Sequence, residues 1–155
     1  MVAKEKYKNT GAYLRQLYDA LVTNLHARLA EEGYSEITPS HGLVFQYAEE
    51  DGSRITELAS RAGMTKQSMS ALVYQLEESG YLKRKRDRQD ARAVLFTLTT
   101  KGQTLRTKAQ QINFEFEKKW EEVLGMAQYE KFRGMLEELA EATVQTTPTT
   151  ASSSK

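Results

Sequence analysis

Apolar residues recur at helical spacing near both ends of the chain and alternate with polar residues in the middle. The first stripe predicts a long helix over about Thr10–Glu32, ended by Gly33, with apolar positions Leu14, Leu17, Tyr18, Leu21, Val22, Leu25 and Leu29. A second long helix is predicted from Leu105, Ala109, Ile112, Phe116, Trp120 and Val123. After a break near Gly125, a last helix carries Phe132, Met135, Leu136 and Leu139.

Shorter helices are predicted between these long ones. Thr38 and Pro39 suit the N-cap and the first position of a helix that ends at Asp51–Gly52. Thr56 is the expected N-cap of the next helix, which Gly63 closes. The helix closed by Gly63, a turn and the helix that follows it indicate a helix-turn-helix unit.

The third short helix leads into a hairpin. Thr65 is its expected N-cap and Gly80 its end, and its buried stripe is Met69, Leu72, Val73 and Leu76. The pattern then changes to period two, with Tyr81–Arg86 as one strand, a turn over Asp87–Ala91, and a second strand with Val94, Phe96 and Leu98. Thr100–Gln103 fits a capping box that starts the next helix.

Composition excludes several classes of protein. With 155 residues, 39% hydrophobic and 28% charged, the chain suits one globular domain, and no apolar run approaches the roughly 18 residues of a membrane span. The Lys-rich start lacks an apolar signal core, so a cytoplasmic protein is expected. There is no cysteine and there are two isolated histidines, His26 and His41, so neither a thiol nucleophile nor a metal site is expected, and no cofactor is implied.

Charge is concentrated in the predicted hairpin. Six cationic and two acidic residues lie between Lys83 and Arg92, a local balance of +4 in a chain whose net charge is +1. A cationic tip neutralises phosphates, and the neighbouring helix presents Gln and Ser, whose side chains suit base edges. The combination favours a protein that reads nucleic acid.

Three segments resemble the MarR family of winged helix-turn-helix regulators. Ile55–Ala59 is similar to the first helix of the motif, and Met64–Leu82 to the recognition helix and the entry to the wing. Asp90-Ala91-Arg92, followed by Leu98–Gly102, is similar to the wing signature of Asp, any residue, Arg, then Leu-Thr and a closing Gly. With the order of the helices, the resemblance extends over roughly residues 10–142.

The resemblance implies a homodimer that binds a pseudo-palindromic operator in double-stranded DNA. It also implies a repressor that a small anionic or phenolic ligand releases. The chain departs from the family in two respects. It lacks the cysteine of the thiol-sensing branch, and at Ala71, where some relatives carry a long base-contacting side chain, it offers at most an apolar contact such as one with a thymine methyl.

The predicted recognition helix carries one set of candidate DNA contacts off its apolar stripe: Lys66, Gln67, Ser68, Ser70, Ala71 and Tyr74. Its first turn is expected in the major groove, where the amide of Gln67 suits adenine. Lys66, Ser68 and Tyr74 are expected near phosphates. The alternative is an ordinary solvated helix face, which the neighbouring cationic hairpin makes the weaker interpretation.

The hairpin carries the second set. Arg92 is expected to enter the minor groove, with Asp90 orienting it through an ion pair. The alternative is a surface salt bridge that closes the turn, worth about 0–1 kcal/mol. Arg84, Arg86 and Arg88 are the expected general phosphate ligands.

An effector pocket like that of the family would lie between the first two helices and the wing. Tyr18, His41 and Phe45 are the candidates for its wall, although ordinary core aromatics and a capped surface or core histidine are the favoured interpretation of these residues. The acidic stretch Glu115–Glu141, with eight Glu and four Lys or Arg, is interpreted as a solvated helix face with i,i+4 pairs.

The predicted fold is mainly α with a small β-hairpin: a winged helix-turn-helix whose terminal helices form an intertwined dimerisation region. The expected divisions are an N-terminal dimerisation helix (1–33), the DNA-binding core (34–99), C-terminal dimerisation helices (100–144) and a disordered tail (145–155). A winged-helix module that docks a protein is the alternative function. No nucleophile–base pair, phosphate loop or metal spacing supports an enzyme.

Overall fold

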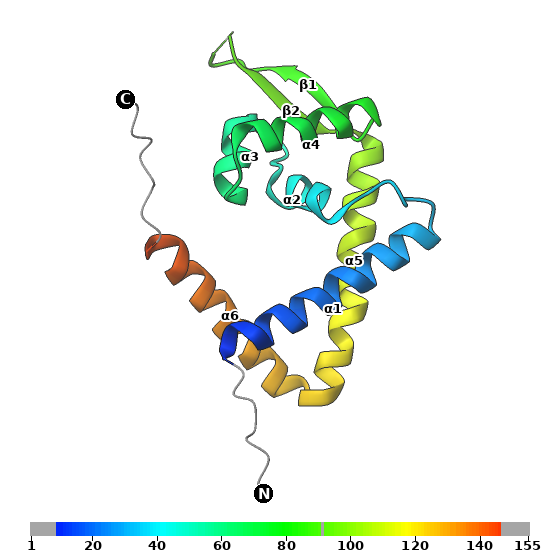
Figure 1. The fold of residues 1–155 in the computed structure, drawn as a ribbon, viewed down its shortest axis with the longest axis vertical. Helices are drawn as coiled ribbons and strands as arrows, with labels where there is room; N and C mark the ends of the chain where they lie inside the picture. The colour runs from blue at the N-terminus through cyan, green and yellow to red at the C-terminus, as the bar shows by residue number, and fades with distance from the viewer. Residues whose placement is uncertain (1–8, 91, 147–155) are drawn as a thin grey trace, which may run out of the picture. The chain divides into compact units, whose positions relative to one another are not determined.

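The computed structural model describes residues 9–90 and 92–146, which contain six helices and a two-stranded hairpin (Figure 1). The elements are α1 (Thr10–Glu31), α2 (Pro39–Tyr47), α3 (Ile55–Ala62), α4 (Lys66–Glu78), β1 (Leu82–Arg86), β2 (Val94–Leu98), α5 (Thr100–Leu124) and α6 (Met126–Thr146). The predicted mainly helical fold with a small hairpin is confirmed. Within these residues, every helix is too short or too polar to span a bilayer.

Two of the predicted helix starts are confirmed. The Thr38 hydroxyl accepts a hydrogen bond from the N–H of His41, and Pro39 takes the first helical position. At the start of α4, the Thr65 hydroxyl accepts from the N–H of Ser68 at 3.1 Å. Each cap satisfies one N–H that has no partner inside its helix.

Two other predicted caps are wrong by one or two residues. Helix α3 begins earlier, because the N–H of Arg54 donates to the carboxylate of Glu57 at 2.8 Å and makes Arg54 the N-cap in place of Thr56. Helix α5 begins at Thr100, and the hydroxyl of Thr99 accepts from the N–H of Gly102 at 3.1 Å. The cap is therefore Thr99, one residue before the predicted capping box.

Helix α2 is shorter than predicted, since it ends at Tyr47 and not at Asp51–Gly52. The backbone of Ala48 is extended, and the chain then reaches the hairpin. There the N–H of Ser53 donates to the carbonyl of Phe96 at 3.0 Å, and the N–H of Phe96 donates back at 2.9 Å. Ser53 therefore adds one bridge to the β2 side of the hairpin, and residues 49–52 connect it to α2.

The hairpin pairs β1 with β2 in antiparallel register, from Leu82 opposite Leu98 to Arg86 opposite Val94. Its base is buried and its outer end is not: Leu82 is 2% exposed, whereas the four following residues of β1 are exposed. The strand pair extends away from the helices (Figure 1), and its exposed part carries the cationic residues of β1.

The packing divides the chain after Asn113. The first unit joins α1 and the beginning of α5 to the helix-turn-helix, because one core contains Leu29, Val44, Leu58, Met69, Val73, Leu76, Tyr81, Phe96, Leu105 and Ile112. This division differs from the predicted boundaries after residues 33 and 99. Leu105 and Ile112, which lie on the predicted dimer stripe, are 1% and 2% exposed within the chain's own core.

The second unit begins at Phe114 and consists of the rest of α5 and α6. Tyr129 is its one buried apolar residue among the described ones, and its hydroxyl donates to Glu117 at 2.7 Å. Burial, together with that carboxylate, raises the pKa of Tyr129 to about 12. Helix α6 includes residues 145 and 146 of the predicted tail, whereas residues 147–155 and residues 1–8 lie outside the described residues.

Gly102 lies where the backbone of α5 comes close to the backbone of Tyr81. A Cβ atom at this position would lie 2.2 Å from the carbonyl oxygen of Tyr81 and 3.1 Å from Cδ2 of Leu98. Tyr81 is itself fully buried, and the N–H of Thr99 donates to the same carbonyl at 3.0 Å. The start of α5 therefore needs a residue without a side chain.

We expect Gly102→Ala to destabilise the protein by about 1–3 kcal/mol, because the backbone of α5 must shift to admit the methyl group. Gly42→Ala is the matched control, since a Cβ in that helical position meets no atom within 4 Å. It should stabilise the protein by about 0.5–1 kcal/mol. Thermal melts at one fixed protein concentration compare the two, and a Gly102→Ala melt at or above that of the wild type would contradict the close packing.

Candidate nucleic-acid interface

The first turn of α4 presents a polar, exposed face. Lys66, Gln67, Ser68 and Ala71 are exposed, while Met69 of the same helix is fully buried. Within the described residues, no hydrogen bond engages the side-chain amide of Gln67. The structure therefore places the predicted base-reading residue on the accessible side of the helix with its donors and acceptor available.

The two serines of this helix already have local partners. The hydroxyl of Thr65 donates to Ser68 Oγ at 2.9 Å, and Ser70 Oγ donates to the carbonyl of Lys66 at 2.8 Å. Ser70 is also partly buried. A serine of this helix that contacts DNA would have to exchange one of these hydrogen bonds for a new one. Lys66 and Gln67 are therefore the polar side chains of the first turn that are most directly available to DNA.

Arg84 has a different place from the one predicted. Its guanidinium donates to both carboxylate oxygens of Glu77, at 2.6 and 3.0 Å, and lies 5.5 Å from the ring centre of Tyr74. The hydrogen bonds to Glu77 raise the pKa of Arg84. Arg84 thus joins β1 to α4 through its ion pair with Glu77, and its role as a phosphate ligand stays a prediction.

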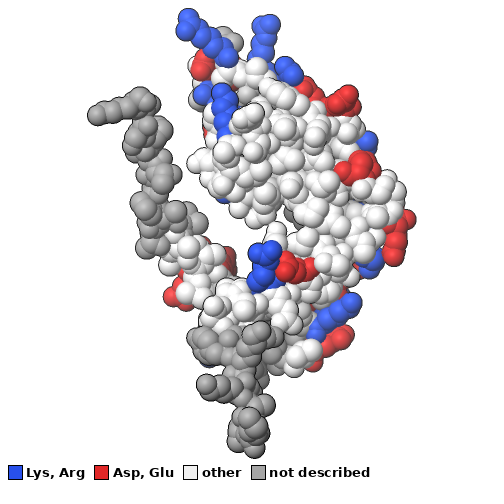
Figure 2. Space-filling view, in the orientation of Figure 1, with Lys and Arg blue, Asp and Glu red and all other residues white. Residues whose placement is uncertain are grey.

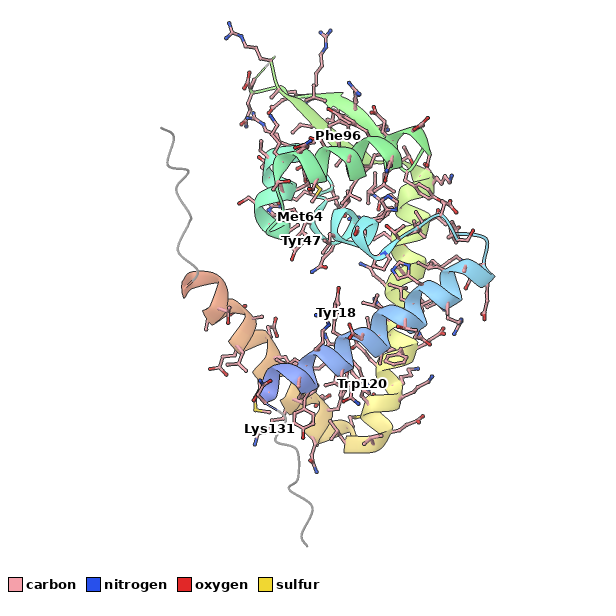
Figure 3. All side chains as sticks on the ribbon, viewed as in Figure 1. Tyr18, Tyr47, Met64, Phe96, Trp120 and Lys131 are labelled. Carbon is pink, nitrogen blue, oxygen red and sulfur yellow. The ribbon has the colours of Figure 1, made fainter. Side chains whose placement is uncertain are left out.

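Tyr74 belongs to the same junction. Its ring meets that of Phe96 edge to face, with 6.1 Å between the ring centres. Phe96 is 3% exposed and lies between the hairpin and α4 (Figure 3). One side of Tyr74 thus helps to fix the hairpin against the recognition helix, and 48% of the residue remains exposed.

The outer end of the hairpin carries the unpaired positive charge. Arg86, Arg88 and Arg92 are exposed, and among residues 9–90 and 92–146 none of their guanidinium groups lies in an ion pair. Figure 2 shows Lys and Arg side chains gathered at this end of the first unit. Such a cluster is the arrangement that phosphate neutralisation needs.

Asp90 does not pair with the Arg92 guanidinium as predicted. Its Oδ1 accepts from the backbone N–H of Arg92 at 3.1 Å, and its Oδ2 lies 3.7 Å from Nη2 of Arg54. The carboxylate therefore shapes the turn and leaves the Arg92 side chain free. Ala91, between the two, lies outside the described residues.

Arg54 is a residue of the site that the sequence analysis missed. Its Nη2 donates to Oδ2 of Asp87 at 2.5 Å, and Oδ1 of Asp87 accepts from the N–H of Gln89 at 2.8 Å. The Arg54 guanidinium holds the pKa of Asp87 below its usual range. No periodicity connects residues 54 and 87, which meet because Ser53 pairs with Phe96.

A cavity of about 380 Å³ lies elsewhere in the first unit, bordered by α1, α2 and the beginning of α5. Tyr18, which projects from α1 (Figure 3), and Phe45 are among its lining residues, and their role in binding an effector stays a prediction. Most of the wall is aliphatic, from residues such as Leu21 and Leu25. A mostly apolar cavity with few polar groups suits a small organic ligand.

His41 does not line this cavity. Its Nδ1 accepts from the N–H of Thr38 at 3.1 Å, and its Nε2 is 3.0 Å from Oε1 of Gln75 in α4. An accepting Nδ1 puts the proton of the neutral ring on Nε2, which donates to Gln75. His41 is thus a buried capping residue that joins α2 to α4, and the predicted pocket wall is corrected at this position.

Five polar lining residues were not predicted: His26, Gln46, Arg106, Gln110 and Asn113. His26 Nδ1 lies 2.9 Å from the carbonyl of Ile37, and Arg106 donates to the carbonyl of Ala48 at 3.2 Å. The side-chain oxygen of Asn113 is buried without a hydrogen-bond partner among the described residues. These residues alternate with apolar ones on helical stripes, so the sequence pattern gives no sign of them.

Comparisons with known proteins agree with this geometry. Residues 36–93 match the model of the MarR family. Over 76 residues the chain is 36% identical to the HTH-type transcriptional regulator TtmR of Methylorubrum extorquens. That alignment covers 48% of this chain and 39% of TtmR, so the chain spans less than half the length of this relative.

Two solved structures share the fold over most of both chains. FabT of Streptococcus pneumoniae in complex with DNA has a TM-score of 0.74 and 16% identity, with 88% of this chain and 96% of that chain covered. The MarR family protein Rv2887 of Mycobacterium tuberculosis in complex with salicylic acid has a TM-score of 0.66 and 24% identity, with 86% and 98% covered. The winged helix-turn-helix fold is confirmed.

We expect Arg54→Gln to loosen the turn of the hairpin, because Asp87 loses its counter-charge. Backbone 15N relaxation of residues 87–90 and 92 measures this, and Arg61→Gln, which removes an exposed pair with Glu49, is the control. Since the folded pKa of Asp87 lies below its ordinary value of 3.8, the stabilisation is present above that pH and is lost as the pH falls through the folded pKa. A turn equally rigid in both variants and at low pH would contradict this role.

Proposed function

We propose that the chain, which is similar to the MarR family, is a dimeric, sequence-specific DNA-binding transcriptional regulator of that family. The observation that carries the proposal is the unpaired cationic end of the hairpin beside the exposed first turn of α4. Phosphate contacts supply affinity, and side chains in the major groove supply specificity. One face of the first unit offers both.

In this proposal α4 enters the major groove and the hairpin reaches the adjacent minor groove. Gln67 contacts a base, and Lys66, Ser68 and Tyr74 lie near phosphates, with Ser70 and Ala71 beside them. Arg92 enters the minor groove, where negative potential is enhanced, and Arg86 and Arg88 meet the flanking backbone. Residues 34–99 form the DNA-binding part.

The dimer uses the terminal helices, residues 1–33 and 100–144. In α1, Leu14 is 45% exposed, and in the second unit Val123 and Leu139 are 83% and 65% exposed. Apolar side chains this exposed on long helices suit burial against a second copy. Since Leu105 and Ile112 are buried in the monomer, the interface draws on these exposed positions.

A small effector that releases a repressor from DNA fits the cavity bordered by α1, α2 and α5. Tyr18 and Phe45 provide aromatic walls, and the guanidinium of Arg106 forms no ion pair among the described residues. The unpartnered oxygen of Asn113 suits a hydroxyl donor. An anionic or phenolic ligand matches these groups, and Rv2887 holds such a molecule, salicylic acid.

The alternative function is a winged-helix module that docks a protein and not DNA. The unpaired arginines favour DNA, because a cluster of like charges projecting from a rigid hairpin matches a polyanion. The proposal places the protein in the cytoplasm, with no enzymatic activity and no bound cofactor or metal. Within the described residues no group of three or more His, Cys, Asp or Glu is positioned to hold a metal ion.

Selection of bound duplexes from a random DNA pool tests the proposal. A symmetric dimer with one α4 per protomer should recover two inverted half-sites about 10 base pairs apart, centre to centre. A protein-docking module would recover no motif, and a single asymmetric half-site at full occupancy would contradict the symmetric dimer.

We expect Gln67→Ala to remove the preference at one base position in each half-site of the selected motif. The cost is about 1–3 kcal/mol for each contact, because one bidentate pairing is lost. Gln128→Ala, an exposed glutamine of α6, is the matched control and should return the wild-type motif. If the motif selected by Gln67→Ala is unchanged, Gln67 does not read a base.

A further inference from the structure

A second hollow, of about 300 Å³, lies between the recognition helix and the hairpin. Lys66 and Tyr74 border it from α4, and Arg84, Val94 and Phe96 border it from the hairpin. Arg54, at the start of α3, completes its wall. The hollow is therefore distinct from the larger cavity and opens on the face that carries the candidate DNA contacts.

The cations of this hollow differ in their availability. Arg54 forms an ion pair with Asp87, and Arg84 forms one with Glu77. Both side chains line the hollow, but their charges are already neutralised. Lys66 is exposed, and among the described residues its ammonium group lies in no ion pair. The hollow thus offers one free cation at its rim, which suits one anionic group.

The floor of the hollow is apolar and incompletely covered. Tyr74 is 48% exposed and Val94 is 44% exposed. Outside α1, these two are the large hydrophobic residues of the first unit that are exposed among the described ones. Both border the same hollow. A free cation above an exposed apolar floor calls for an amphipathic occupant, anionic at one end and apolar at the other.

The position of the hollow identifies that occupant. One sugar–phosphate strand separates the major groove of duplex DNA from the adjacent minor groove. A protein that puts α4 in one groove and its hairpin in the other must hold that strand between them. The strand consists of anionic phosphates and weakly polar deoxyribose rings, which match the rim and the floor.

We propose that the hollow seats one nucleotide of the DNA backbone in each half-site. The ammonium group of Lys66 binds its phosphate, and Tyr74 and Val94 pack against its deoxyribose. The inference rests on the proposed DNA-binding function and goes beyond it, because it assigns one phosphate to one residue and gives Val94 a role. It also explains why the hairpin is fixed to α4, because the hollow can hold a nucleotide only when the hairpin and α4 keep one distance from each other.

Single-phosphate neutralisation tests this assignment. Duplexes carrying the selected motif receive one neutral methylphosphonate at a time, and affinity is measured for the wild type, Lys66→Ala and the control Lys131→Ala. For the wild type and the control, several positions should weaken binding, because Arg86, Arg88 and Arg92 also meet phosphates. One position in each half-site, the phosphate assigned to Lys66, should weaken it about ten-fold, the size of a lost charge-assisted contact. For Lys66→Ala the same position should have no further effect, because its partner is already absent.

Val94→Asp provides the independent arm, since it puts a carboxylate in the floor beside the phosphate. It should weaken binding about ten-fold to unmodified DNA and lose less on DNA that is neutral at the assigned position. Should its thermal melt fall below that of the wild type, Val94→Ala replaces it, with an expected loss of a few-fold.

The experiment separates failure of the nucleotide seat from failure of the proposed DNA-binding function. Binding of DNA with identical methylphosphonate profiles for the wild type and Lys66→Ala would overturn the seat and leave the regulator function intact. Failure of the wild type to bind any duplex would overturn the proposed function, and the seat with it. A shared sensitive position that disappears in Lys66→Ala supports both.

Discussion

Two backbone hydrogen bonds between Ser53 and Phe96 hold the hairpin beside the helix-turn-helix. Ser53 is fully buried and Phe96 is 3% exposed, so both bonds are shielded from water. The Phe96 ring then meets Tyr74 of α4, and Arg84 joins β1 to Glu77 of the same helix. Because of these contacts, the recognition helix and the hairpin form one surface, and the hollow between them has fixed walls.

In the same arrangement, the arginines of the hairpin region differ in whether they form ion pairs. The arginines close to the body of the unit, Arg54 and Arg84, are neutralised by carboxylates, while those at the outer end are not. The acidic residues of the turn, Asp87 and Asp90, face Arg54 and so oppose the approach of phosphates less than their count suggests. The positive charge of the tip is therefore carried by Arg86, Arg88 and Arg92, while its two acidic residues lie toward Arg54.

Helix α2 lies between the two candidate sites of the first unit. Through Phe45 it lines the larger cavity, and through His41 it donates a hydrogen bond to Gln75 of the recognition helix. Val44, between them, is fully buried. A ligand in the cavity and a DNA base at α4 thus contact elements that share one packed helix.

The sequence predicts the elements of this fold well because their signals are local. Thr38 and Thr65 are confirmed as caps, and the alternation of Val94, Phe96 and Leu98 gives the second strand. What it misses depends on contacts between distant residues. The end of α2 follows from the pairing of Ser53 with Phe96, and the roles of Arg54 and Arg84 follow from carboxylates that no periodicity connects to them.

In the candidate sites, too, the sequence misses what depends on contacts between distant residues. Gln67 and the arginines at the tip could be predicted, since exposure follows from the helical stripe and from the strand pattern. The cavity could not be predicted in detail, because His41 turns toward Gln75, and because Arg106 and Asn113 lie beside the apolar stripe of α5 without any local signal that they face the cavity. Side-chain direction is decided by tertiary packing, which a single sequence does not display.

The central claim is that the unpaired arginines of the hairpin meet DNA phosphates. Its most direct test is the salt dependence of DNA affinity for the wild type and for a variant that combines Arg86→Ala, Arg88→Ala and Arg92→Ala. A variant with Lys118, Lys119 and Lys131 changed to Ala is the control of equal net charge. Loss of three contacts from each protomer of a dimer should make the slope of log affinity against log salt shallower by about 5, while the control keeps the wild-type slope. Parallel slopes for all three proteins would contradict the claim.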